Sequence, residues 1–516
     1  MKTFNNPILP GFYPDPSICR VNDDYYLVTS SFAYYPGVPI FHSKDLVNWE
    51  QIGHVLDRPT QLPLDGQRQS QGIFAPTIRY YDGVFYMITT NVGHGGNFFV
   101  TATDPSGPWS DPYYLDAPGI DPSLFFDEDG KVYYTGTRPA PEGEKYSGNW
   151  EVWLQELDLE TKQLVGEPTG LWRGALRDVI WPEGPHLYKV NGSYYLLISE
   201  AGTGHHHAVS VARSEHVSGP YVGNPGNPIL THRHLGKEYP IVNVGHCDLV
   251  DTQNGEWWAV GLASRIYGGY YRNLGRETFL LPVTWEDGWP VMSPGTGKLE
   301  MAYPLPDLPT VQSLIPSVCD HFEEEKLDYI WNFIRTPKGK FYSLTERPGH
   351  LSLKLRPQQI SELVQPSFVG RRQQHMDFAA STAMEFTPTS EIEEAGIVLL
   401  QSHEYHFRFV YTKQGKQQVM RLIKCTEGNE EVLKELPIDA AKVYLKVQAK
   451  GQDYSFYFGE TTAHYKALIE NVDGRILSTD VAGGFVGAVL GMYASSNGSS
   501  SDEKAYFDWF EYVGME

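Results

Sequence analysis

Three carboxylic acids stand in similar local surroundings at widely separated places in this sequence. Asp15 lies within Tyr13-Pro14-Asp15-Pro16-Ser17, Asp121 within Gly119-Ile120-Asp121-Pro122-Ser123, and Glu183 within Trp181-Pro182-Glu183-Gly184-Pro185-His186. Carboxyl groups that lie near one another can divide the work of a general acid and a general base between them. An Asp beside a proline is also a common way to open a turn. Acid–base catalysis by these residues therefore requires that the fold bring the three acids close together, whereas a role in turns does not.

The local sequence predicts different proton affinities for these acids. Glu183 follows Trp181 and Pro182, and partial desolvation by apolar neighbours raises the pKa of a carboxyl group. We therefore predict that Glu183 is protonated near neutral pH and can donate a proton. Asp15 and Asp121 are each followed by Pro and Ser, and we expect both to stay ionised.

The acids belong to a sequence phrase that occurs five times and consists of a short turn, an apolar residue, a polar hairpin and a strand rich in Tyr or Trp. Its copies centre on the following residues: Asp15, Ala75, Asp121, Glu183 and His246. They lie on the order of 40–60 residues apart, which is the period of four-stranded propeller blades. The sequence thus predicts an all-β fold that begins with a five-bladed β-propeller. The innermost strand of each blade lines the central channel, so the three acids and His246 should meet at one end of it.

The repeats stop at a proline-rich segment, Pro304-Leu305-Pro306-Asp307-Leu308-Pro309. Beyond it, alternating apolar strands such as Val443-Tyr444-Leu445-Lys446-Val447 predict a β-sandwich. We place the propeller at residues 1–303, a linker at 304–318 and the sandwich at 319–516. Three roles stay open for the sandwich: sugar binding, assembly of a homo-oligomer (dimer or tetramer), or bracing of the propeller.

Composition limits the partners and the location. The chain has 516 residues and a formal net charge of −22, which argues against nucleic acid or an anionic membrane as the partner, because both require a basic face. No signal-like or membrane-spanning apolar run is visible, so we expect a cytoplasmic protein. Four cysteines do not make a disulfide framework in a chain of this length. Cys19 and Cys247 lie in neighbouring blades if the ring closes, but we expect free thiols.

Five further residues are candidates for binding a neutral substrate. Phe32 lies in an aromatic loop, Phe74 precedes the second copy of the phrase, and Trp150 lies in a long loop of the third blade. His207 ends a run of three His residues, which alternate sides on a strand and so cannot all bind one metal. Either His207 or His205 can face the channel. Arg276 can offset the negative charge of the acids. The alternatives are that Phe32 packs a blade edge and that Arg276 pairs with Glu277 or another surface acid.

The acid motifs Tyr13-Pro14-Asp15-Pro16-Ser17, Gly119-Ile120-Asp121-Pro122-Ser123 and Trp181-Pro182-Glu183-Gly184-Pro185-His186 resemble glycoside hydrolase family 43. The likeness covers essentially the whole chain and points to the two-domain β-xylosidases and α-L-arabinofuranosidases, whose second domain is a jelly-roll, lectin-like sandwich. It implies that Asp15 is the general base, that Glu183 is the general acid, and that Asp121 tunes the pKa of the acid and orients it.

The resemblance also implies inversion of configuration, for which the two carboxyl groups of Asp15 and Glu183 should lie roughly 6.5–9.5 Å apart so that a water fits. It places Arg276 against the terminal sugar and requires no cofactor for the chemistry. His246 matches a His that approaches a calcium ion in some members, although one His without an acidic cage is weak support for such a site. Many β-xylosidases have Trp where this chain has Phe74, which leaves the preference between xylose and arabinose open.

We therefore predict an inverting exo-glycoside hydrolase that releases terminal xylose or arabinofuranose, or both, from xylo- or arabino-oligosaccharides. Exo action follows from the aromatic loop around Phe32 and from a second domain large enough to block one side of the mouth. The alternatives are a sugar-binding propeller without catalysis, an endo-acting arabinanase, and a retaining propeller enzyme acting on fructosides. An acid with a raised pKa favours the hydrolase, because binding alone does not require one.

Overall fold

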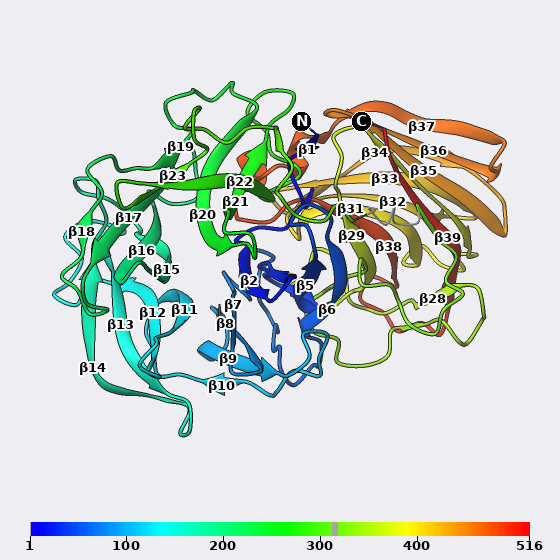
Figure 1. Cartoon of the computed structure of the whole chain (residues 1–516). Helices are drawn as coiled ribbons and strands as arrows, with labels where there is room; N and C mark the ends of the chain where they lie inside the picture. The colour runs from blue at the N-terminus through cyan, green and yellow to red at the C-terminus, as the bar shows by residue number, and fades with distance from the viewer. Residues whose placement is uncertain (1, 312–317, 516) are drawn as a thin grey trace.

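The computed structural model describes residues 2–311 and 318–515, and they are almost entirely β-strands and turns, so the prediction of an all-β fold is confirmed. Figure 1 shows two parts side by side, one containing strands β2 to β23 and the other containing strands β25 to β39. The helices of the described residues, η1 (Gly474–Leu477) and α1 (Thr479–Ala482), have four residues each and are too short to cross a bilayer.

Within the described residues, the first part contains five antiparallel sheets, each running outward from an inner strand. The first sheet consists of β2 (Ser17–Val21), β3 (Asp24–Val28), β5 (Gly37–Ser43) and β6 (Glu50–Leu56). The second consists of β7 (Thr77–Tyr81), β8 (Val84–Asn91), β9 (Gly96–Ala102) and β10 (Tyr113–Tyr114). The third consists of β11 (Ile120–Phe126), β12 (Val132–Pro139), β13 (Trp150–Asp158) and β14 (Gln163–Trp172).

The fourth sheet consists of β15 (Glu183–Val190), β16 (Ser193–Glu200), β17 (Ala208–Ser214), β18 (Val222–Gly223) and the added strand β19 (Leu230–Thr231). The fifth consists of β20 (Ile241–Asp251), β21 (Trp257–Arg265), β22 (Glu277–Glu286) and β23 (Trp289–Met292). The inner strands contact one another in the order β2, β7, β11, β15, β20 and back to β2. The five sheets thus form a closed ring, which we call the ring below.

Turn residues explain why each inner strand folds back on its neighbour. Asn191 and Gly192, with φ of 50° and 81°, connect β15 to β16, and Asp82 and Gly83, with φ of 47° and 81°, connect β7 to β8. Two successive residues with positive φ form the tight hairpin turn that matches the twist of paired strands, and Asn-Gly and Asp-Gly are its preferred sequences. The hairpin signals in the sequence therefore fix where each sheet begins.

Three of the inner strands are irregular near their first residues, where the repeated phrase lies. The pairing register shifts between Ile120 and Ser123 in β11, between Glu183 and His186 in β15, and within β20. Asp15, Asp121 and His246 have φ of 53°, 53° and 48°, a left-handed conformation that is uncommon for residues other than glycine. Bulges of this kind re-aim side chains near active sites, and here they direct the predicted site residues.

The second part is a sandwich of two sheets. One sheet, in spatial order, consists of β27 (Tyr342–Ser343), β28 (Leu351–Lys354), β39 (Lys504–Gly514), β30 (Phe378–Glu385), β35 (Lys442–Lys450), β36 (Asp453–Thr461) and β37 (His464–Asp473), with β25 (Cys319–Asp320) paired to β39. The other consists of β29 (Ser367–Arg372), β38 (Val489–Ser495), β31 (Glu394–Ser402), β32 (Tyr405–Gln414), β33 (Gln417–Thr426) and β34 (Asn429–Pro437).

Alternation of residue types builds the sandwich core. In β35, Val443, Leu445 and Val447 are fully buried while the residues between them are partly exposed, as expected for a strand with one face on a core. Phe407 and Phe409 of β32 lie 5.9 and 5.5 Å, between ring centroids, from Phe456 of β36 in the other sheet. The two sheets therefore pack face to face.

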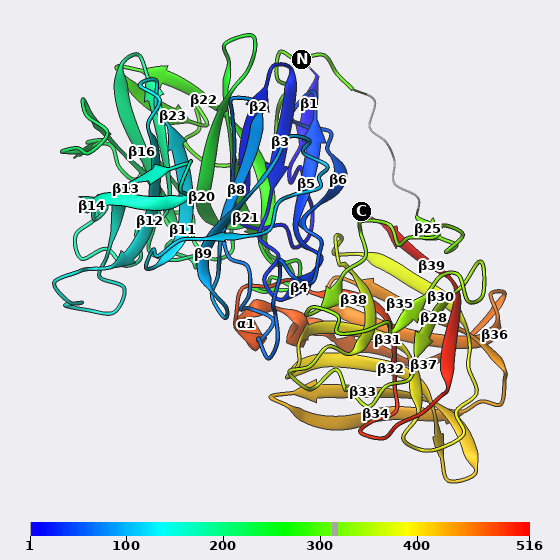
Figure 2. The same ribbon diagram turned by 90° about the horizontal axis from the view of Figure 1, so that it is seen from below.

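The ring and the sandwich are joined by strands from both. β4 (Tyr34–Tyr35), in the aromatic loop of the ring, pairs with β26 (Phe333–Ile334). A separate pair, β1 (Thr3–Asn5) with β24 (Ala302–Pro304), brings together the first and last strands of the first part. Figure 2 shows β4 and α1 at the junction of the two parts. The predicted linker at 304–318 includes residues 312–317, which lie outside the described residues.

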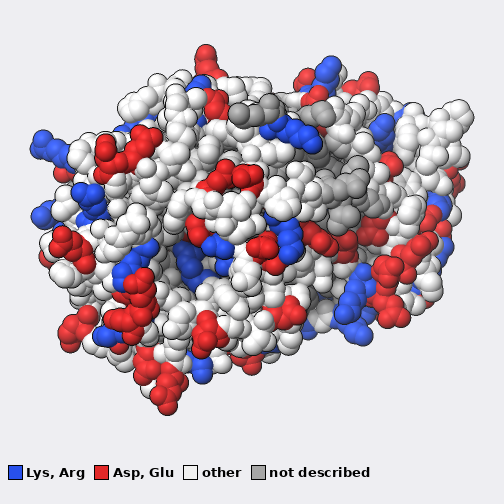
Figure 3. All heavy atoms as spheres, viewed as in Figure 1, with Lys and Arg blue, Asp and Glu red and all other residues white. Residues whose placement is uncertain are grey.

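The structure shows how charged residues and cysteines are distributed. Figure 3 shows acidic and basic residues mixed over the face in view, and a hollow in the ring with Lys or Arg atoms at its floor. Cys19 and Cys247, the pair for which a contact was considered, form no disulfide in the part of the chain that the structure describes. Burial raises the pKa of the Cys19 thiol to about 12, which makes this thiol unreactive.

Candidate active site

A pocket of about 290 Å³ opens at the end of the ring next to α1. All nine residues singled out in the sequence line it: Asp15, Phe32, Phe74, Asp121, Trp150, Glu183, His207, His246 and Arg276. The pocket is also lined by Ala75, Ile120, Trp181, Gly202, Thr203, Leu262 and Phe485. The closed ring thus brings together residues from all five of its sheets.

Asp15 is buried and bound by a cation. Arg276 donates from Nη1 to Oδ1 at 2.6 Å and from Nη2 to Oδ2 at 3.3 Å, and the Ser30 hydroxyl donates to Oδ2 at 2.5 Å. Burial alone would raise the pKa of Asp15, but Arg276, His246 and the Ser30 hydrogen bond outweigh it and lower the pKa. Asp15 is therefore ionised, as the sequence led us to expect, and can accept a proton.

Arg276 offsets the negative charge of the site, and the alternative pairing considered for it is wrong. Glu277 pairs instead with Arg265, at 2.8 Å between Oε2 and Nε, and accepts a hydrogen bond from the Gly11 N–H at 2.8 Å. Arg276 immediately precedes Glu277, the first residue of β22, and successive residues of extended backbone point to opposite sides. Arg276 consequently faces the pocket while Glu277 faces away from it.

Glu183 has the opposite electrostatic environment from Asp15. Its side chain keeps 17% of its surface exposed. Burial, the Asp121 carboxyl and the Asp15 carboxylate raise its pKa well above the ordinary value, and the more distant Arg276 opposes them. Asp15 and Glu183 are therefore separated in proton affinity, which is the arrangement that general acid–base catalysis needs.

Asp121 lies beside Glu183 and is more deeply buried than its neighbours in the sequence suggest. Its Oδ2 accepts a hydrogen bond from the Gly184 N–H at 3.2 Å, which ties β11 to the start of β15. Burial and the nearby Asp15 raise the pKa of Asp121, while His246 and the Gly184 hydrogen bond oppose the rise. The sequence did not predict this rise, because the flanking Pro and Ser do not reveal how deeply the ring buries Asp121. A pKa of about 6 is still compatible with the expectation that Asp121 stays ionised near neutral pH.

His207 is a neutral imidazole facing the acid. It is fully buried, its Nδ1 lies 2.9 Å from the Asn243 carbonyl oxygen, and burial lowers its pKa to about 3. Because a carbonyl can only accept, Nδ1 carries the proton and Nε2 keeps a free lone pair. Nε2 lies 3.6 Å from Glu183 Oε1, so a small closure would let protonated Glu183 donate to it.

His246 completes the axial wall of the pocket, packed so tightly against Gly184 that a Cβ there would lie 2.7 Å from its ring. Its backbone N–H donates to the Ser199 hydroxyl at 2.5 Å. Calcium prefers six to eight oxygen ligands, and in the part of the chain that the structure describes no group of three or more His, Cys, Asp or Glu is arranged to hold a metal. One imidazole without such a cage does not fit a calcium ion held by the protein.

Aromatic rings line the same pocket as the acids. Phe32 is 2% exposed and lies 5.3 Å from Phe74, between ring centroids. Trp150, at the start of β13, donates from its indole N–H to Glu144 at 2.9 Å and lines the rim. Apolar rings beside charged hydrogen-bonding groups suit a sugar, whose faces are apolar and whose edges carry hydroxyl groups.

Phe485 is the pocket residue that comes from the sandwich, and sequence reasoning missed it. It follows α1 in the sandwich and stacks on Phe32 at 6.1 Å between ring centroids, with an interplanar angle of 25°. Its backbone N–H donates to the Ser70 hydroxyl at 2.9 Å, and a Cβ on Gly484 would lie 2.2 Å from the same hydroxyl. The Gly483-Gly484 pair before it was the available signal, since it permits this close approach.

The comparisons with known proteins agree with the geometry. Residues 4–290 match the family model described as glycosyl hydrolases family 43, and residues 319–513 match the β-xylosidase C-terminal concanavalin A-like domain. The chain is 52% identical over 516 residues to a Butyrivibrio fibrisolvens protein named xylosidase/arabinosidase, covering 99% of both chains. It is 42% identical to a non-reducing end α-L-arabinofuranosidase of Bacteroides ovatus, covering 99% of this chain and 95% of the relative.

Solved structures show the same likeness over both parts of the chain. The crystal structure of a xylan β-1,4-xylosidase from Bacillus halodurans C-125 superposes with a TM-score of 0.93 at 37% identity and covers 99% of each chain. A Bacteroides ovatus structure titled xyloglucan PUL GH43B superposes with a TM-score of 0.93 at 40% identity and covers 100% of each chain. The chain is therefore a glycoside hydrolase and belongs to family 43.

Proposed function

We propose that the enzyme is an inverting exo-glycosidase that releases terminal xylose or arabinofuranose, or both, from xylo- and arabino-oligosaccharides. The observation that carries the proposal is the pair Asp15 and Glu183, whose pKa values are pushed in opposite directions within one pocket. The names of the relatives support both pentoses. Phe74, at the position where many β-xylosidases have Trp, leaves the choice between them to experiment.

In the proposed mechanism, a water molecule attacks the anomeric carbon of the terminal sugar while Asp15 takes its proton. Glu183 gives a proton to the departing glycosidic oxygen, so the leaving group departs as an alcohol. Asp121 keeps the pKa of Glu183 high and, through the Gly184 N–H, fixes the start of its strand. Arg276 holds Asp15 ionised and presents a cation to the sugar hydroxyl groups.

Exo action is supported by the sandwich, which covers one side of the pocket. Phe485 reaches the pocket wall, and Arg272 of the ring pairs with Asp480 of α1 at 2.8 Å. The buried Arg372 of the sandwich donates to the Phe12 carbonyl oxygen at 2.6 Å and lies 4.3 Å from the Tyr13 ring centroid, just before Asp15. The sandwich thus supports both the base and the pocket wall, which favours a bracing role over the other two roles considered.

Several finer features of the architecture follow as part of the proposal. We infer that the ring is a five-bladed β-propeller, supported by its cyclic order of inner strands, and that the domains divide near residues 303 and 319. Family 43 hydrolysis needs no cofactor, and no step above uses calcium. Assembly into a dimer or tetramer is testable by light scattering.

The test of the proposed function compares 4-nitrophenyl β-xyloside, 4-nitrophenyl α-L-arabinofuranoside and unsubstituted xylo-oligosaccharides. We expect rapid release of 4-nitrophenol from at least one aryl pentoside, and release of single pentoses with the α configuration from xylose-terminated chains. Anomer analysis by NMR of early products checks inversion. Internal cuts in long xylan without free pentose among the early products would overturn the exo assignment.

The pH dependence tests the role of Asp121. Glu183 must be protonated to act, so activity is lost as the pH rises through its pKa. In Asp121→Asn the negative charge that raises this pKa is gone, while the amide oxygen can still accept from the Gly184 N–H. We expect the basic limb of the kcat/KM profile to move down by about one pH unit.

The matched control for this shift is Asp127→Asn. Asp127 follows the same strand, β11, but bonds Lys189 and Tyr194 outside the pocket. Its replacement should leave the basic limb in place. An unmoved or upward-moving limb in Asp121→Asn would show that Asp121 does not set the pKa of Glu183.

A further inference from the structure

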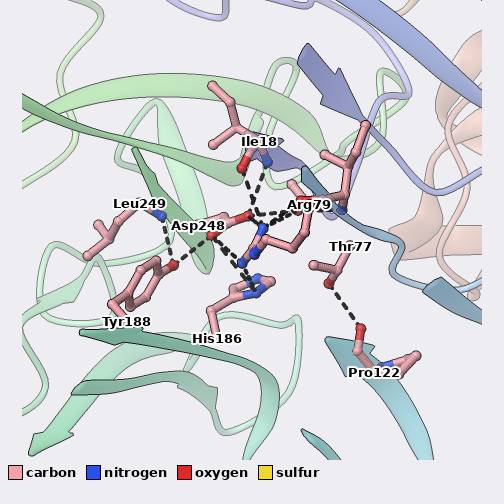
Figure 4. Close-up of polar contacts among 10 residues, drawn as sticks. Ile18, Thr77, Arg79, Pro122, His186, Tyr188, Asp248 and Leu249 are labelled. Atoms are coloured by element: carbon pink, nitrogen blue, oxygen red, sulfur yellow. Dashed lines mark hydrogen bonds and ion pairs between the residues drawn. The ribbon is translucent and has the colours of Figure 1, made fainter. Parts of the chain in front are cut away.

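A buried cluster of polar side chains fills the centre of the ring beneath the active site (Figure 4). Arg79 of β7 donates to both carboxylate oxygens of Asp248 of β20, from Nη1 to Oδ2 at 2.8 Å and from Nη2 to Oδ1 at 3.1 Å. The Tyr188 hydroxyl of β15 donates to Asp248 Oδ1 at 2.6 Å, and the Ser17 hydroxyl of β2 donates to Oδ2 at 2.7 Å. Arg79 Nη2 also lies 3.0 Å from His186 Nδ1 of β15. One carboxylate therefore connects four inner strands.

The fifth inner strand joins the same layer through its backbone. The Thr77 hydroxyl of β7 donates to the Pro122 carbonyl oxygen of β11 at 3.0 Å. The Ile78 N–H donates to the Ser17 hydroxyl at 3.1 Å, and the Leu249 N–H donates to the Tyr188 hydroxyl at 2.9 Å. The layer thus joins β11 to β7, β7 to β2 and to β20, and β20 to β2 and to β15.

The cluster residues lie immediately downstream of the active-site residues on the same strands. Ser17 is two residues after Asp15, Pro122 is one after Asp121, His186 is three after Glu183, and Asp248 is two after His246. Any slip of one inner strand along the axis would therefore move an active-site group and its anchor together. The layer fixes the height of base and acid relative to each other.

The backbone between the two layers needs such an anchor. The pairing register shifts between Glu183 and His186, and again between Gly245 and Asp248, so the regular ladder does not hold the strand at these points. Asp15, Asp121 and His246 have positive φ, a strained conformation that persists only when surrounding contacts over-determine it. The bulges interrupt the backbone hydrogen bonds that would hold these strands in register. The side-chain bonds to Asp248, in the layer next to the active site, hold the strands instead.

The pair itself is a poor source of stability. Asp248 is fully buried and Arg79 is 16% exposed at its side chain. Burial alone would raise the pKa of Asp248, but Arg79 outweighs it and holds the carboxylate ionised. Burying both charges costs about as much as their attraction returns, and apolar residues of similar volume can do as well for stability. A role in positioning the inner strands explains the buried Arg79–Asp248 pair better than a role in stability does.

We propose that Asp248, Arg79 and Tyr188 are positioning residues, which fix the separation of Asp15 and Glu183 by locking the inner strands at one height. The proposal rests on the proposed roles of these two acids. Misplacement of a catalytic group by about 1 Å can cost on the order of a hundredfold in rate. The cluster therefore acts on kcat more than on substrate binding.

The first test uses two tyrosines whose hydroxyl groups each donate to an aspartate at the same distance. Tyr188 donates to Asp248, and Tyr194, in the next strand, donates to Asp127 at the same distance of 2.6 Å. Both are replaced by Phe, and kcat and KM are measured on xylobiose together with the Tm. We expect Tyr188→Phe to lower kcat about tenfold with KM within about twofold, while Tyr194→Phe keeps the wild-type kcat. Equal kcat values in the two variants, or a fall explained by a lower Tm, would overturn the proposal.

The second test uses charge and shape at Arg79. Arg79→Lys keeps the charge and one hydrogen bond to Asp248, whereas Arg79→Met keeps only the length of the side chain. We expect Arg79→Lys to recover a substantial part of the kcat lost in Arg79→Met at temperatures well below both Tm values. Equal kcat in the two variants counts against positioning. Wild-type enzyme that is inactive on every pentoside would refute the proposed function. Active wild-type enzyme with equal kcat values in the two variants would refute the positioning role alone.

Discussion

Glu183→Ala is expected to lower kcat/KM on xylobiose about a thousandfold and on 4-nitrophenyl β-xyloside no more than about tenfold. A general acid typically contributes a factor of about 10² to 10⁴, and its contribution is largest when the leaving group is a poor one. A sugar alcohol departs with difficulty unless it is protonated, whereas 4-nitrophenolate departs unaided. The raised pKa of Glu183, caused by burial and by Asp121 and Asp15, is the reason for the assignment.

The measurement compares the two substrates in wild type, Glu183→Ala and Glu183→Gln. Gln keeps the volume of the side chain but cannot deliver a proton, so both variants should show the same dependence on the leaving group. If arabinofuranose is the preferred sugar, the corresponding arabinosides replace the xylosides. Equal losses on both substrates would show that Glu183 does not protonate the leaving group.

The repeats explain why so much of the site was predictable from sequence. A residue at one place in the phrase must reach one height on the axis once the sheets close into a ring, so Asp15, Asp121, Glu183 and His246 could be placed in one pocket. Hairpin sequences such as Asn191-Gly192 located the strands by their own backbone preferences. The ring and the meeting of these four residues were therefore predictable from local turn preferences and from the repeated phrase.

The features that sequence did not reveal arise from contacts between distant segments. Phe485 occurs once, outside the repeats, and its backbone bonds Ser70 across 415 positions of sequence. Arg276 finds Asp15 across 261 positions only because the last sheet closes against the first. The raised pKa of Asp121 depends on burial by the whole ring. Arg79 escaped notice for a similar reason, since nothing near it in sequence marks Asp248 as its partner.

The base should behave differently from the acid when it is removed. In Asp15→Asn the amide cannot take a proton from water, so the attack is slowed whatever the leaving group. We expect kcat/KM to fall about a thousandfold on both xylobiose and the aryl xyloside. The amide oxygen can keep the hydrogen bond from Arg276 Nη1, and the Ser30 hydroxyl can turn to accept from the amide NH2, while the longer bond from Arg276 Nη2 is lost. The pocket should therefore keep its shape.

Azide tests the role of Asp15, because this anion attacks carbon without needing a base. A retaining enzyme that has lost its nucleophile would also give the inverted azide, so the result is read together with the α anomer expected as the wild-type product. If Asp15 only activates water, azide added to Asp15→Asn should restore release of 4-nitrophenol from the β-xyloside and give the α-xylosyl azide, with inverted configuration. The matched control is Asp45→Asn, since Asp45 is also a buried carboxyl but caps a turn far from the pocket through the Val47 and Asn48 N–H groups. That control should keep wild-type activity and gain nothing from azide. A β-xylosyl azide as product would mean that the reaction passes through a covalent intermediate, and Asp15 would then not be the base of an inverting enzyme.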